Sequence, residues 1–399
     1  MTEIQFPSQA PDPGWRGRLH RRLRHQSARA SRHALVGLVV CLGVLIFDGT
    51  LGEHLRAVDH ARAVGSHAQA AGTDARFTAV MVGDVMFGRH VERVTERHGL
   101  DGPLASVDHL LDGDYVSANL EQVVSDDEEL PEADKLIHLR SGTEVAQALA
   151  DAGITTVSLA NNHTMDHGIP GLRDTIAAVE AAGLEHAGAG EDLDAARVTN
   201  VQEHDDLTVA TLSFTDVFVQ GFVARSFQGG VLEADPDVFV PLIREARQDA
   251  DLVIVNFHWG EEYDLRVRAD QREMAESAAQ AGADIIVGHH PHVLMPVERI
   301  GSTLVLYSLG NFVFDQGWTR TRESAVARYE LQQDGTARVE LVPVFIREAT
   351  PRELRGPSGT YRRERIFQQV AGDGLDWVRE DGRLVTEIDH SHVIGEADR

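Results

Sequence analysis

The feature that most constrains this chain is a strand–helix–strand pattern in which both strands end in histidine. Buried-strand patterns cover Leu252–Phe257 and Asp284–Val287, and the run from about Ala269 to Ala281 between them has helical spacing. A strand, a helix and a strand in this order form a βαβ unit, whose two strands end at the same edge of a parallel sheet, where open α/β proteins place their sites. The histidines after the two strands should therefore lie close together. They are His258 after the first strand and His289, His290 and His292 after the second.

Three earlier strand patterns also end in residues that are able to bind a metal ion. The first begins at Phe77, the second covers about Tyr115–Ala118, and the third is the segment ITTVSLA. The residues that follow these strands are Asp84 after Gly83, then Asn119 and Glu121, then Asn161, Asn162 and His163. Together with the βαβ unit, five strand ends carry carboxylate, amide or imidazole groups.

Each of these strand ends also has a simpler interpretation when it is taken alone. A Gly-Asp pair after a strand is often a turn, and Asn161-Asn162-His163 is compatible with a turn that caps the helix following Pro170. Turn chemistry explains five such strand ends poorly. Amide, carboxylate and imidazole groups suit a borderline or hard divalent cation, with Asp166 placed to fix a histidine tautomer. The sequence therefore predicts a site for one or two divalent metal ions.

Composition bounds the class of protein. A chain of 399 residues with 42% hydrophobic residues can bury a large core. Its formal net charge is −26, and Lys135 is the only lysine. Because an acidic surface repels nucleic acid, we expect no nucleic-acid partner. The sequence contains no Gly-rich phosphate loop, nucleophilic serine motif or internal repeat.

The N-terminal segment predicts membrane targeting. Residues 16–33 carry seven arginines and no acidic residue, and the uncharged apolar run Ala34–Phe47 follows. This run is short for a membrane span and also fits the apolar core of a cleavable signal peptide. Since no small-x-small cleavage motif follows closely, we expect an uncleaved signal anchor. The protein would then be a single-pass protein of the cell membrane, with its C-terminal domain extracytoplasmic.

Seven ordered segments resemble the CapA family of capsule and poly-γ-glutamate synthesis proteins. They are GDVMFGRH, ANLE, SLANNHTMDHG, GAGEDLDAAR, NFHWGEEY, GADIIVGHHPHV and YSLGNFVFDQ, between about Phe77 and Asp315. The resemblance implies a divergent calcineurin-type metallophosphoesterase domain, an α/β fold built as a four-layer α/β/β/α sandwich, here preceded by one N-terminal membrane segment. It also implies a role in making or exporting an anionic extracellular polymer. The expected partners are that polymer and a poly-γ-glutamate synthetase or export complex.

The resemblance also implies roles for individual residues. The metal ligands, around manganese, iron or zinc, would be Asp84, Glu121, Asn162, His258, His290 and His292. His289 with His290 is an alternative to His290 with His292. The catalytic residues would be His163, next to the leaving group, and Asp166, which orients His163. The substrate-binding residues would be Arg89, Asn119 and Asn311. Two of them have a simpler alternative: Arg89 as an ordinary surface arginine, and Asn311 as a residue that caps a β-turn.

Two positions depart from the metallophosphoesterase pattern. The residue two after Asp84, usually histidine in those enzymes, is Met86, and the usual bridging aspartate is Glu121. Either change is able to weaken one metal position. Three functions therefore stay open: a factor in polymer synthesis, a metal-dependent phosphoesterase or other hydrolase, and a non-catalytic scaffold or polymer-binding protein. Glu262 and Tyr263 are expected to brace the loop after His258.

These observations predict five segments. They are a basic cytoplasmic N-terminus at 1–33, a transmembrane signal anchor at 34–50, a stalk at 51–76, a CapA metallophosphoesterase-like domain at 77–345 and a peripheral C-terminal extension at 346–399. A hairpin of about Ser324–Leu331 and Ala337–Phe345 is expected to complete the second sheet. A short helix around Arg362–Val370 is expected to lie at the periphery.

Overall fold

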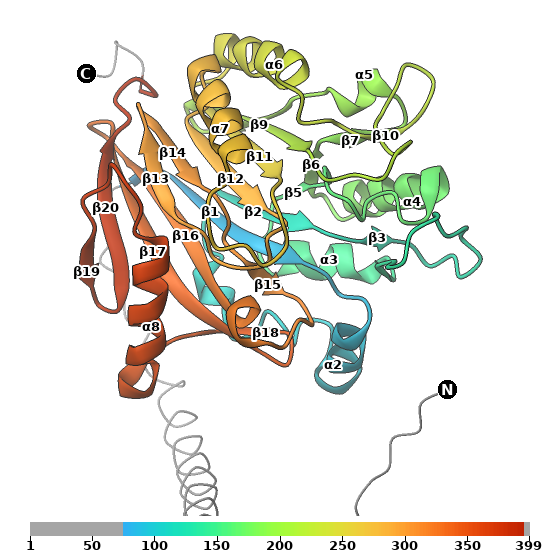
Figure 1. The fold of residues 1–399 in the computed structure, drawn as a ribbon, viewed down its shortest axis with the longest axis horizontal. Coiled ribbons are helices and arrows are strands. Elements are labelled where there is room, and N and C mark those ends of the chain that lie inside the picture. Colours follow the sequence, from blue (N-terminus) through green and yellow to red (C-terminus); the bar gives the residue numbers. More distant parts are fainter. Residues whose placement is uncertain (1–74, 395–399) are drawn as a thin grey trace, which may run out of the picture. The chain divides into compact units, whose positions relative to one another are not determined.

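A computed structural model describes residues 75–394, which form two large β-sheets flanked by helices (Figure 1). The larger sheet has the strand order β19-β20-β17-β16-β1-β2-β5-β6, with β15 beside β1 and β18 beside β17. Its strands are β1 (Ala75–Val85), β2 (Tyr115–Leu120), β5 (Thr156–Ser158), β6 (Glu185–Ala187), β15 (Asn311–Val313), β16 (Glu323–Gln332), β17 (Thr336–Arg347), β18 (Thr350–Glu353), β19 (Val378–Glu380) and β20 (Arg383–Asp389). The four strands β1, β2, β5 and β6 are parallel, so they end at one edge.

The smaller sheet has the strand order β13-β14-β12-β11-β9-β8. Its strands are β8 (Asn200–His204), β9 (Leu207–Thr215), β11 (Leu252–His258), β12 (Ile285–His289), β13 (Val297–Ile300) and β14 (Thr303–Leu306). The central strands β9, β11, β12 and β14 are parallel. Two short strand pairs lie outside both sheets: β3 (Val123–Val124) with β4 (Arg140–Ser141), and β7 (Ala189–Gly190) with β10 (Gly230–Val231).

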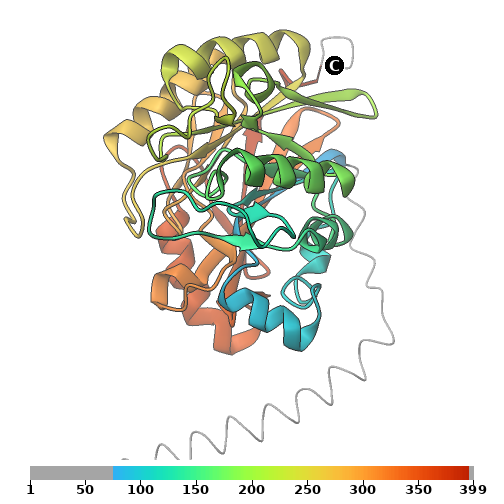
Figure 2. The ribbon, with the colours of Figure 1, turned by 90° about the vertical axis from the view of Figure 1, so that its right-hand side faces the viewer.

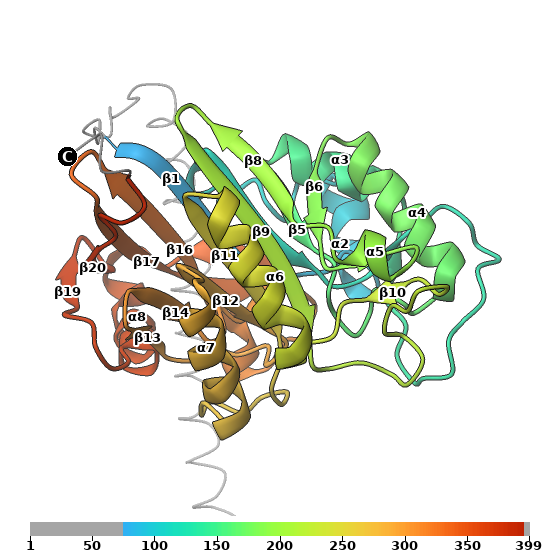
Figure 3. The same ribbon diagram turned by 90° about the horizontal axis from the view of Figure 1, so that it is seen from above.

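Helices cover the outer faces of both sheets. They are α2 (His90–His98), α3 (Glu144–Asp151), α4 (Gly168–Ala181), α5 (Leu193–Ala196), α6 (Pro236–Asp249) and α7 (Ala269–Ala281). Helix α8 (Gly356–Val370) packs instead against the core between the sheets, and η1 (Asp108–Leu110) and η2 (Thr319–Arg322) are short 3-10 helices. In Figure 2 the yellow helices α6 and α7 and the blue helix α2 lie at opposite ends, with strands between them. Figure 3 shows α6 and α7 over β9, β11 and β12.

Three hydrophobic cores separate these layers. Successive side chains of a strand point to opposite faces, so β1 sends Phe77 and Met81 into the core between the sheets and Val80 and Val82 into the core beneath α2, α3 and α4. The third core packs the smaller sheet against α6 and α7. The described residues therefore have four layers in the order helices, sheet, sheet, helices, and the predicted α/β class is confirmed.

The strand–helix–strand pattern is confirmed at the level of its elements. Helix α7 has the predicted bounds, and β11 and β12 are parallel neighbours. Both strands run one or two residues further than predicted, to His258 and His289. The histidines therefore stand at the same edge of the smaller sheet, as expected.

The C-terminal part of the chain differs from the prediction. The hairpin β16–β17 does not complete the smaller sheet, because β16 pairs antiparallel with β1 in the larger sheet. The residues after 345 are not peripheral either: β20 pairs with β17, and Ile366, Phe367 and Ile388 lie in the core between the sheets. These later residues cover the edge of β17 and the open end of the core between the sheets.

The predicted signal anchor and stalk lie outside the described residues, except that β1 begins at Ala75, inside the range given to the stalk. Within residues 75–394, no helix has the length and apolar character needed to cross a membrane.

Candidate functional site

Strand ends from both sheets meet around a buried cluster of acidic and imidazole side chains. Three residues lie on strands or just after them: Asp84 in β1, Glu121 after β2 and His258 at the end of β11. The segment after β12 adds His290 and His292. Each of the five is at most 5% exposed. The cluster thus combines the carboxyl edges of two sheets.

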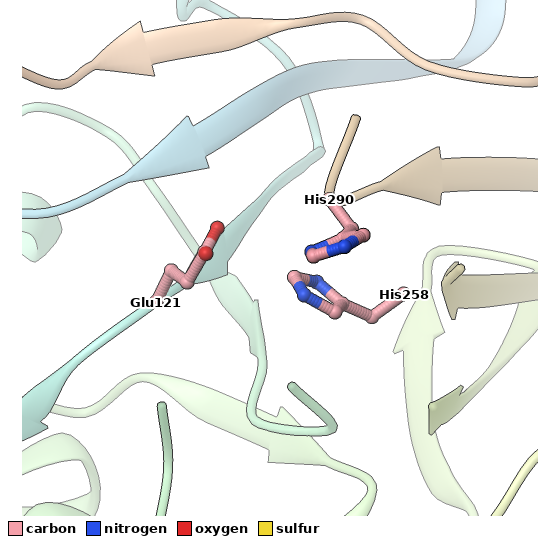
Figure 4. A group of neighbouring side chains, drawn as sticks. All are labelled: Glu121, His258 and His290. Atoms are coloured by element: carbon pink, nitrogen blue, oxygen red, sulfur yellow. The ribbon is translucent and has the colours of Figure 1, made fainter. Parts of the chain in front are cut away.

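The atoms of this cluster are close enough to share a cation. One potential ligand atom each from Asp84, Glu121 and His292 lie within 4.8 Å of one another, and the same holds for Glu121, His258 and His290. Figure 4 shows the Glu121 carboxylate facing the His258 and His290 imidazoles, whose ring centroids are 4.8 Å apart. Glu121 therefore belongs to both groups.

The histidine segment holds an unusual backbone. His290 has φ 93° and His292 has φ 56°, with Pro291 between them. Non-glycine residues rarely adopt positive φ, and buried examples persist only where the surrounding structure enforces them. The enforced conformation turns both imidazoles into the cluster.

Asp84 is the anionic centre of the cluster. Its Oδ1 accepts a hydrogen bond from Asn119 Nδ2 at 2.9 Å, and its Oδ2 lies 3.1 Å from His292 Nδ1. Burial by itself raises the pKa of Asp84, but the neighbouring His289 and His292 imidazoles outweigh it and hold the pKa well below its usual range. Asp84 is therefore ionised.

Glu121 is the opposite case. Burial raises its pKa well above the usual range; the His292 imidazole opposes that shift, while the charge of Asp84 adds to it. Its Oε2 accepts from Asn119 Nδ2 at 3.2 Å, whereas Oε1 has no hydrogen-bond donor among the described residues. Two carboxylates in one buried site favour a bound cation, because the cation removes the cost of ionising both.

The imidazoles are held by amide side chains. His292 Nδ1 lies 2.9 Å from Asn311 Oδ1, so this nitrogen carries a proton and Nε2 faces Glu121 Oε1 at 3.6 Å. Burial lowers the pKa of His292, but Glu121 and Asp84 outweigh it and raise the pKa to about 9. His258 Nε2 lies 3.0 Å from Asn162 Oδ1, and burial together with His290 lowers the pKa of His258.

These residues fit a divalent metal ion. At this site, four buried ring or carboxylate atoms have no hydrogen-bond partner among the described residues: Glu121 Oε1, His290 Nδ1 and both ring nitrogens of His289. Buried polar atoms without partners are unfavourable unless something else binds them. Carboxylate and imidazole groups are ligands for divalent transition metals, so the missing partner is consistent with a cation.

A second group of charged residues adjoins the cluster. His163 Nδ1 lies 2.7 Å from Asp166 Oδ2, and Lys135 Nζ lies 2.5 Å from Asp166 Oδ1. Lys135 also donates to the Asn162 carbonyl oxygen at 2.7 Å. Burial lowers the pKa of His163, an effect that Asp166 partly offsets. The predicted pair of His163 and Asp166 is thus in contact, and Lys135 holds it against the Asn162 backbone.

The structure places the six residues predicted as metal ligands as follows. Five of them, Asp84, Glu121, His258, His290 and His292, supply the groups with mutually close ligand atoms, while Asn162 adjoins them through His258. His289 Nδ1 lies 3.3 Å from Asp84 Oδ1, but His289 belongs to none of these groups among the described residues. The geometry therefore favours His290 with His292 over His289 with His290.

The three residues predicted to bind substrate each contact other side chains at or near the cluster. Asn119 and Asn311 are fully buried, and their amides hold Asp84, Glu121 and His292 in place. Arg89 pairs with Asp315, and its guanidinium carbon lies 5.8 Å from the centroid of the Phe314 ring. The two amides therefore orient the acidic and imidazole groups of the cluster, and their contact with a substrate stays a prediction.

Two residues near the cluster had no predicted role in the chemistry. Glu262 has a ligand atom within 4.8 Å of His290 and His292, although the sequence predicts only that it braces the loop. Tyr263 fits that bracing role, because its N–H donates to the Pro291 carbonyl at 2.8 Å. The sequence drew attention to Lys135 only because it is the single lysine of the chain. Met86 lies fully buried in the core beneath α2, α3 and α4, away from a ligand position.

Sequence comparison finds relatives in bacteria. The profile described as "Bacterial capsule synthesis protein PGA_cap" matches residues 78–316. A "PGA biosynthesis protein CapA" of Bacillus subtilis is 45% identical over 325 residues, which cover 81% of this chain and 85% of that protein. A "Capsule biosynthesis protein CapA" of Bacillus anthracis is 42% identical over 329 residues, covering 80% and 79%.

Structural comparison finds more distant similarity. A putative 5′-nucleotidase of Staphylococcus aureus, solved with alpha-ketoglutarate, gives a TM-score of 0.41 at 15% identity and covers 73% of this chain and 58% of its own. The NAD nucleotidase of Haemophilus influenzae gives a TM-score of 0.39 at 12% identity, covering 72% and 55%. At this level of similarity, no activity is transferred from these proteins.

Proposed function

The chain belongs to the family of bacterial capsule synthesis proteins, and from this membership we propose that it acts in the synthesis or export of an anionic capsule polymer such as poly-γ-glutamate. The observation that carries its chemistry is the buried group of Asp84, Glu121, His258, His290 and His292. We further propose that this group binds one or two divalent ions, manganese, iron or zinc, and that the protein is a metal-dependent hydrolase.

The proposed location is the outer side of the cell membrane. The arginine-rich residues 16–33 and the apolar run Ala34–Phe47 support an uncleaved signal anchor. A polymer synthetase or export complex is the proposed partner there. The metallophosphoesterase-like assignment of the fold is part of this proposal, and two stacked sheets with ligands at their carboxyl edges support it.

The proposed ligands are arranged by the residues behind them. Asp84 and Glu121 supply negative charge and are aligned by one amide, that of Asn119. His292 is oriented by Asn311, which leaves Nε2 facing the cluster. A bound divalent ion supplies electrophilic activation of a phosphoryl or carbonyl group and of water. Burial of the ligands keeps bulk water away from these charges and strengthens their interaction.

His163 is the proposed proton donor to the leaving group. Its Nδ1–H donates to Asp166, while Nε2 makes no hydrogen bond among the described residues. Asp166 stabilises the imidazolium whenever His163 holds a second proton, as the acidic partner of histidine does in hydrolase triads. Lys135 and the Leu139 N–H, at 2.5 and 2.7 Å, keep the Asp166 carboxylate in place. These contacts leave Nε2 as the nitrogen from which His163 delivers a proton.

Metal content tests the proposal. Elemental analysis of the purified full-length protein should find about one to two equivalents of manganese, iron or zinc. The His258→Ala and His292→Ala variants should both lose the metal, whereas His186→Ala, in β6, should keep it. Hydrolysis of a generic phosphodiester by the metal-loaded protein is then measured. Absence of metal in the wild type, with none taken up on titration, would leave a scaffold or polymer-binding role instead.

A further inference from the structure

Two arginines from distant parts of the sequence stack on one phenylalanine, and the charge of a third lies close to one of them. Arg322 ends η2, Arg347 ends β17 and Arg362 lies in α8. The guanidinium carbons of Arg322 and Arg362 lie 4.4 and 4.3 Å from the centroid of the Phe345 ring. Burial and the charges of Arg362 and Arg347 lower the pKa of Arg322, so the three charges are close. We call Arg322, Arg347 and Arg362 the Phe345 arginine cluster.

The arginines of this cluster have no carboxylate partners among residues 75–394. Arg322 uses Nε to donate to the Ile346 carbonyl at 2.9 Å, and neither Arg347 nor Arg362 forms an ion pair within that range. Neighbouring arginines are paired, by contrast. The pairs are Arg320 and Arg365 with Glu323, and Arg355 with Glu353.

This lack of partners is informative because acidic residues are abundant. The chain has 63 acidic residues against 37 lysines and arginines. Three adjacent guanidinium groups repel one another, and a neighbouring carboxylate would relieve that repulsion. Arg347 and Arg362 are exposed and Arg322 is partly exposed, so an external anion can reach them. The cluster is thus an unpaired group of positive charges on a protein whose net charge is strongly negative.

We propose that the Phe345 arginine cluster binds carboxylates of an extended glutamate polymer, an inference that rests on the proposed role in polymer synthesis. A guanidinium group matches a carboxylate as a bidentate fork. Stacking on Phe345 orders two of the guanidinium groups before binding, so less side-chain entropy is lost on contact. Several arginines together favour a chain with repeated carboxylates, since one contact raises the effective concentration of the next.

The cluster is connected to the metal-binding group through η2. Thr321 precedes Arg322, and its carbonyl accepts from Asn311 Nδ2 at 3.1 Å. Asn311 in turn holds His292. A polymer bound at the cluster is therefore anchored on the segment that supports the site, which suits a role in presenting the chain to it.

Acidic residues around the cluster argue against an anionic membrane as its ligand. Glu348 follows Arg347 directly and is exposed, and Glu364 in α8 lies two residues after Arg362. A flat anionic surface would meet these carboxylates together with the arginines. A narrow chain is able to contact the arginines alone. The local charge pattern therefore favours a linear polycarboxylate.

The test measures binding of fluorescently labelled oligo-γ-glutamate to the full-length protein. The triple variant Arg322→Gln, Arg347→Gln, Arg362→Gln should bind roughly tenfold or more weakly than the wild type. The matched control Arg173→Gln, Arg266→Gln, Arg379→Gln removes the same charge from arginines that are paired with Glu191, Asp264 and Glu364. The control should stay within about twofold of the wild type.

Three results would overturn the proposal. Equal weakening in both triple variants would show that only net charge matters. Wild-type protein that ignores the oligomer but binds anionic phospholipid vesicles through the cluster would identify a membrane surface. Inorganic phosphate that displaces the oligomer at equal molarity would identify a small-anion site. If the triple variant is poorly folded, Arg347→Gln alone replaces it in the test, because this change removes no guanidinium group that stacks on Phe345. Arg347→Gln should also bind the oligomer more weakly than the wild type does.

Metal analysis separates this inference from the proposed function. The triple variant should keep its metal, and His292→Ala should keep its affinity for the oligomer. Loss of oligomer binding in the wild type with metal present overturns the cluster assignment alone. Absence of metal with oligomer binding intact overturns the hydrolase proposal alone.

Discussion

At the scale of single residues, the charges nearest the site are arranged as buried pairs. Lys135 is 13% exposed along its side chain, and its partner Asp166 is fully buried. Asp166 accepts three hydrogen bonds, from Lys135, His163 and the Leu139 N–H. A buried carboxylate with this many donors depends on each of them, because removing one leaves charge without compensation.

Lys135→Met should destabilise the protein by ~3–5 kcal/mol, since it leaves Asp166 without its cationic partner. Urea unfolding of the wild type and the variant measures this difference. The double variant Lys135→Met, Asp166→Asn should recover part of the loss, because the buried charge is also removed. A midpoint of urea unfolding that is the same for Lys135→Met and the wild type would contradict the role of Lys135 as the cationic partner of Asp166.

His390 provides a pH-dependent contribution to stability. Its Nδ1 lies 2.8 Å from the Tyr329 hydroxyl and its Nε2 lies 2.7 Å from the Ser302 carbonyl, so the neutral ring accepts at Nδ1 and donates at Nε2. Burial lowers the pKa of His390 below its usual value. The unfolded chain therefore takes up this proton first as the pH falls. The stabilisation is complete above the unfolded pKa of about 6.5 and is lost as the pH falls below it.

His390→Gln should therefore reduce the acid sensitivity of the protein. The difference in Tm between about pH 7.5 and pH 5.5 should be smaller in the variant than in the wild type. Other buried histidines are present in both proteins, so the comparison isolates His390. A difference in Tm between the two pH values that is the same in the variant and the wild type would show that the His390 ring is already protonated in the folded protein.

At the scale of elements, two strands that carry site residues pass their neighbours without space for a side chain. A Cβ at Gly83, before Asp84, would lie 1.7 Å from the Gly310 carbonyl oxygen. A Cβ at Gly288, before His289, would lie 2.0 Å from the Tyr307 carbonyl oxygen and 2.5 Å from Trp259 Nε1. These close approaches set the positions from which β1 and β12 deliver their ligands.

Gly288→Ala should cost ~1–3 kcal/mol of stability or more, because backbone and a buried indole must shift. It should also lower the metal content, since His290 and His292 follow on the same chain. Gly317→Ala is the control, because a Cβ there meets nothing within 4 Å. Denaturant unfolding and elemental analysis measure both effects. Equal stability of the two variants would contradict the close approach.

At the scale of the whole molecule, the proposed metal would link the two sheets. Asp84 and Glu121 come from the larger sheet, and His258, His290 and His292 come from the smaller one. The apolar core between the sheets and hydrogen bonds such as those of Thr211 with Tyr115 and of Gln202 with Thr156 also join these layers. A shared cation would therefore contribute to the stability of the sandwich as well as to its chemistry.

Chelation of the metal should lower the Tm of the wild type. A ligand at 100 times its Kd stabilises the folded state by ~2.7 kcal/mol, and removal forfeits that amount. Differential scanning calorimetry with and without EDTA measures the change. His292→Ala should melt at the same temperature in both conditions. A wild-type Tm that chelator leaves unchanged would show that the folded state holds no metal.

Local pattern in the sequence determined the elements and most of the proposed ligands. Strand and helix periods depend on neighbouring residues, which is why α7 has its predicted bounds and β11 and β12 are parallel neighbours. Polar groups at strand ends were visible for the same reason. The ordered motifs also indicated the family. The predicted membrane anchor lies outside the described residues and stays a prediction.

Tertiary structure decided what depends on distant residues. The sheet that β16 joins is set by its pairing with β1, about 250 residues earlier in the chain, which no local period encodes. The hydrogen bonds of the Asn119 and Asn311 amides with Asp84, Glu121 and His292 are likewise set by the fold, while the contact of these two residues with substrate stays a prediction. Only folding brings Arg322 and Arg362 onto Phe345 and Arg347 close to Arg322, since contacts through space, and not spacing along the chain, determine which charges meet.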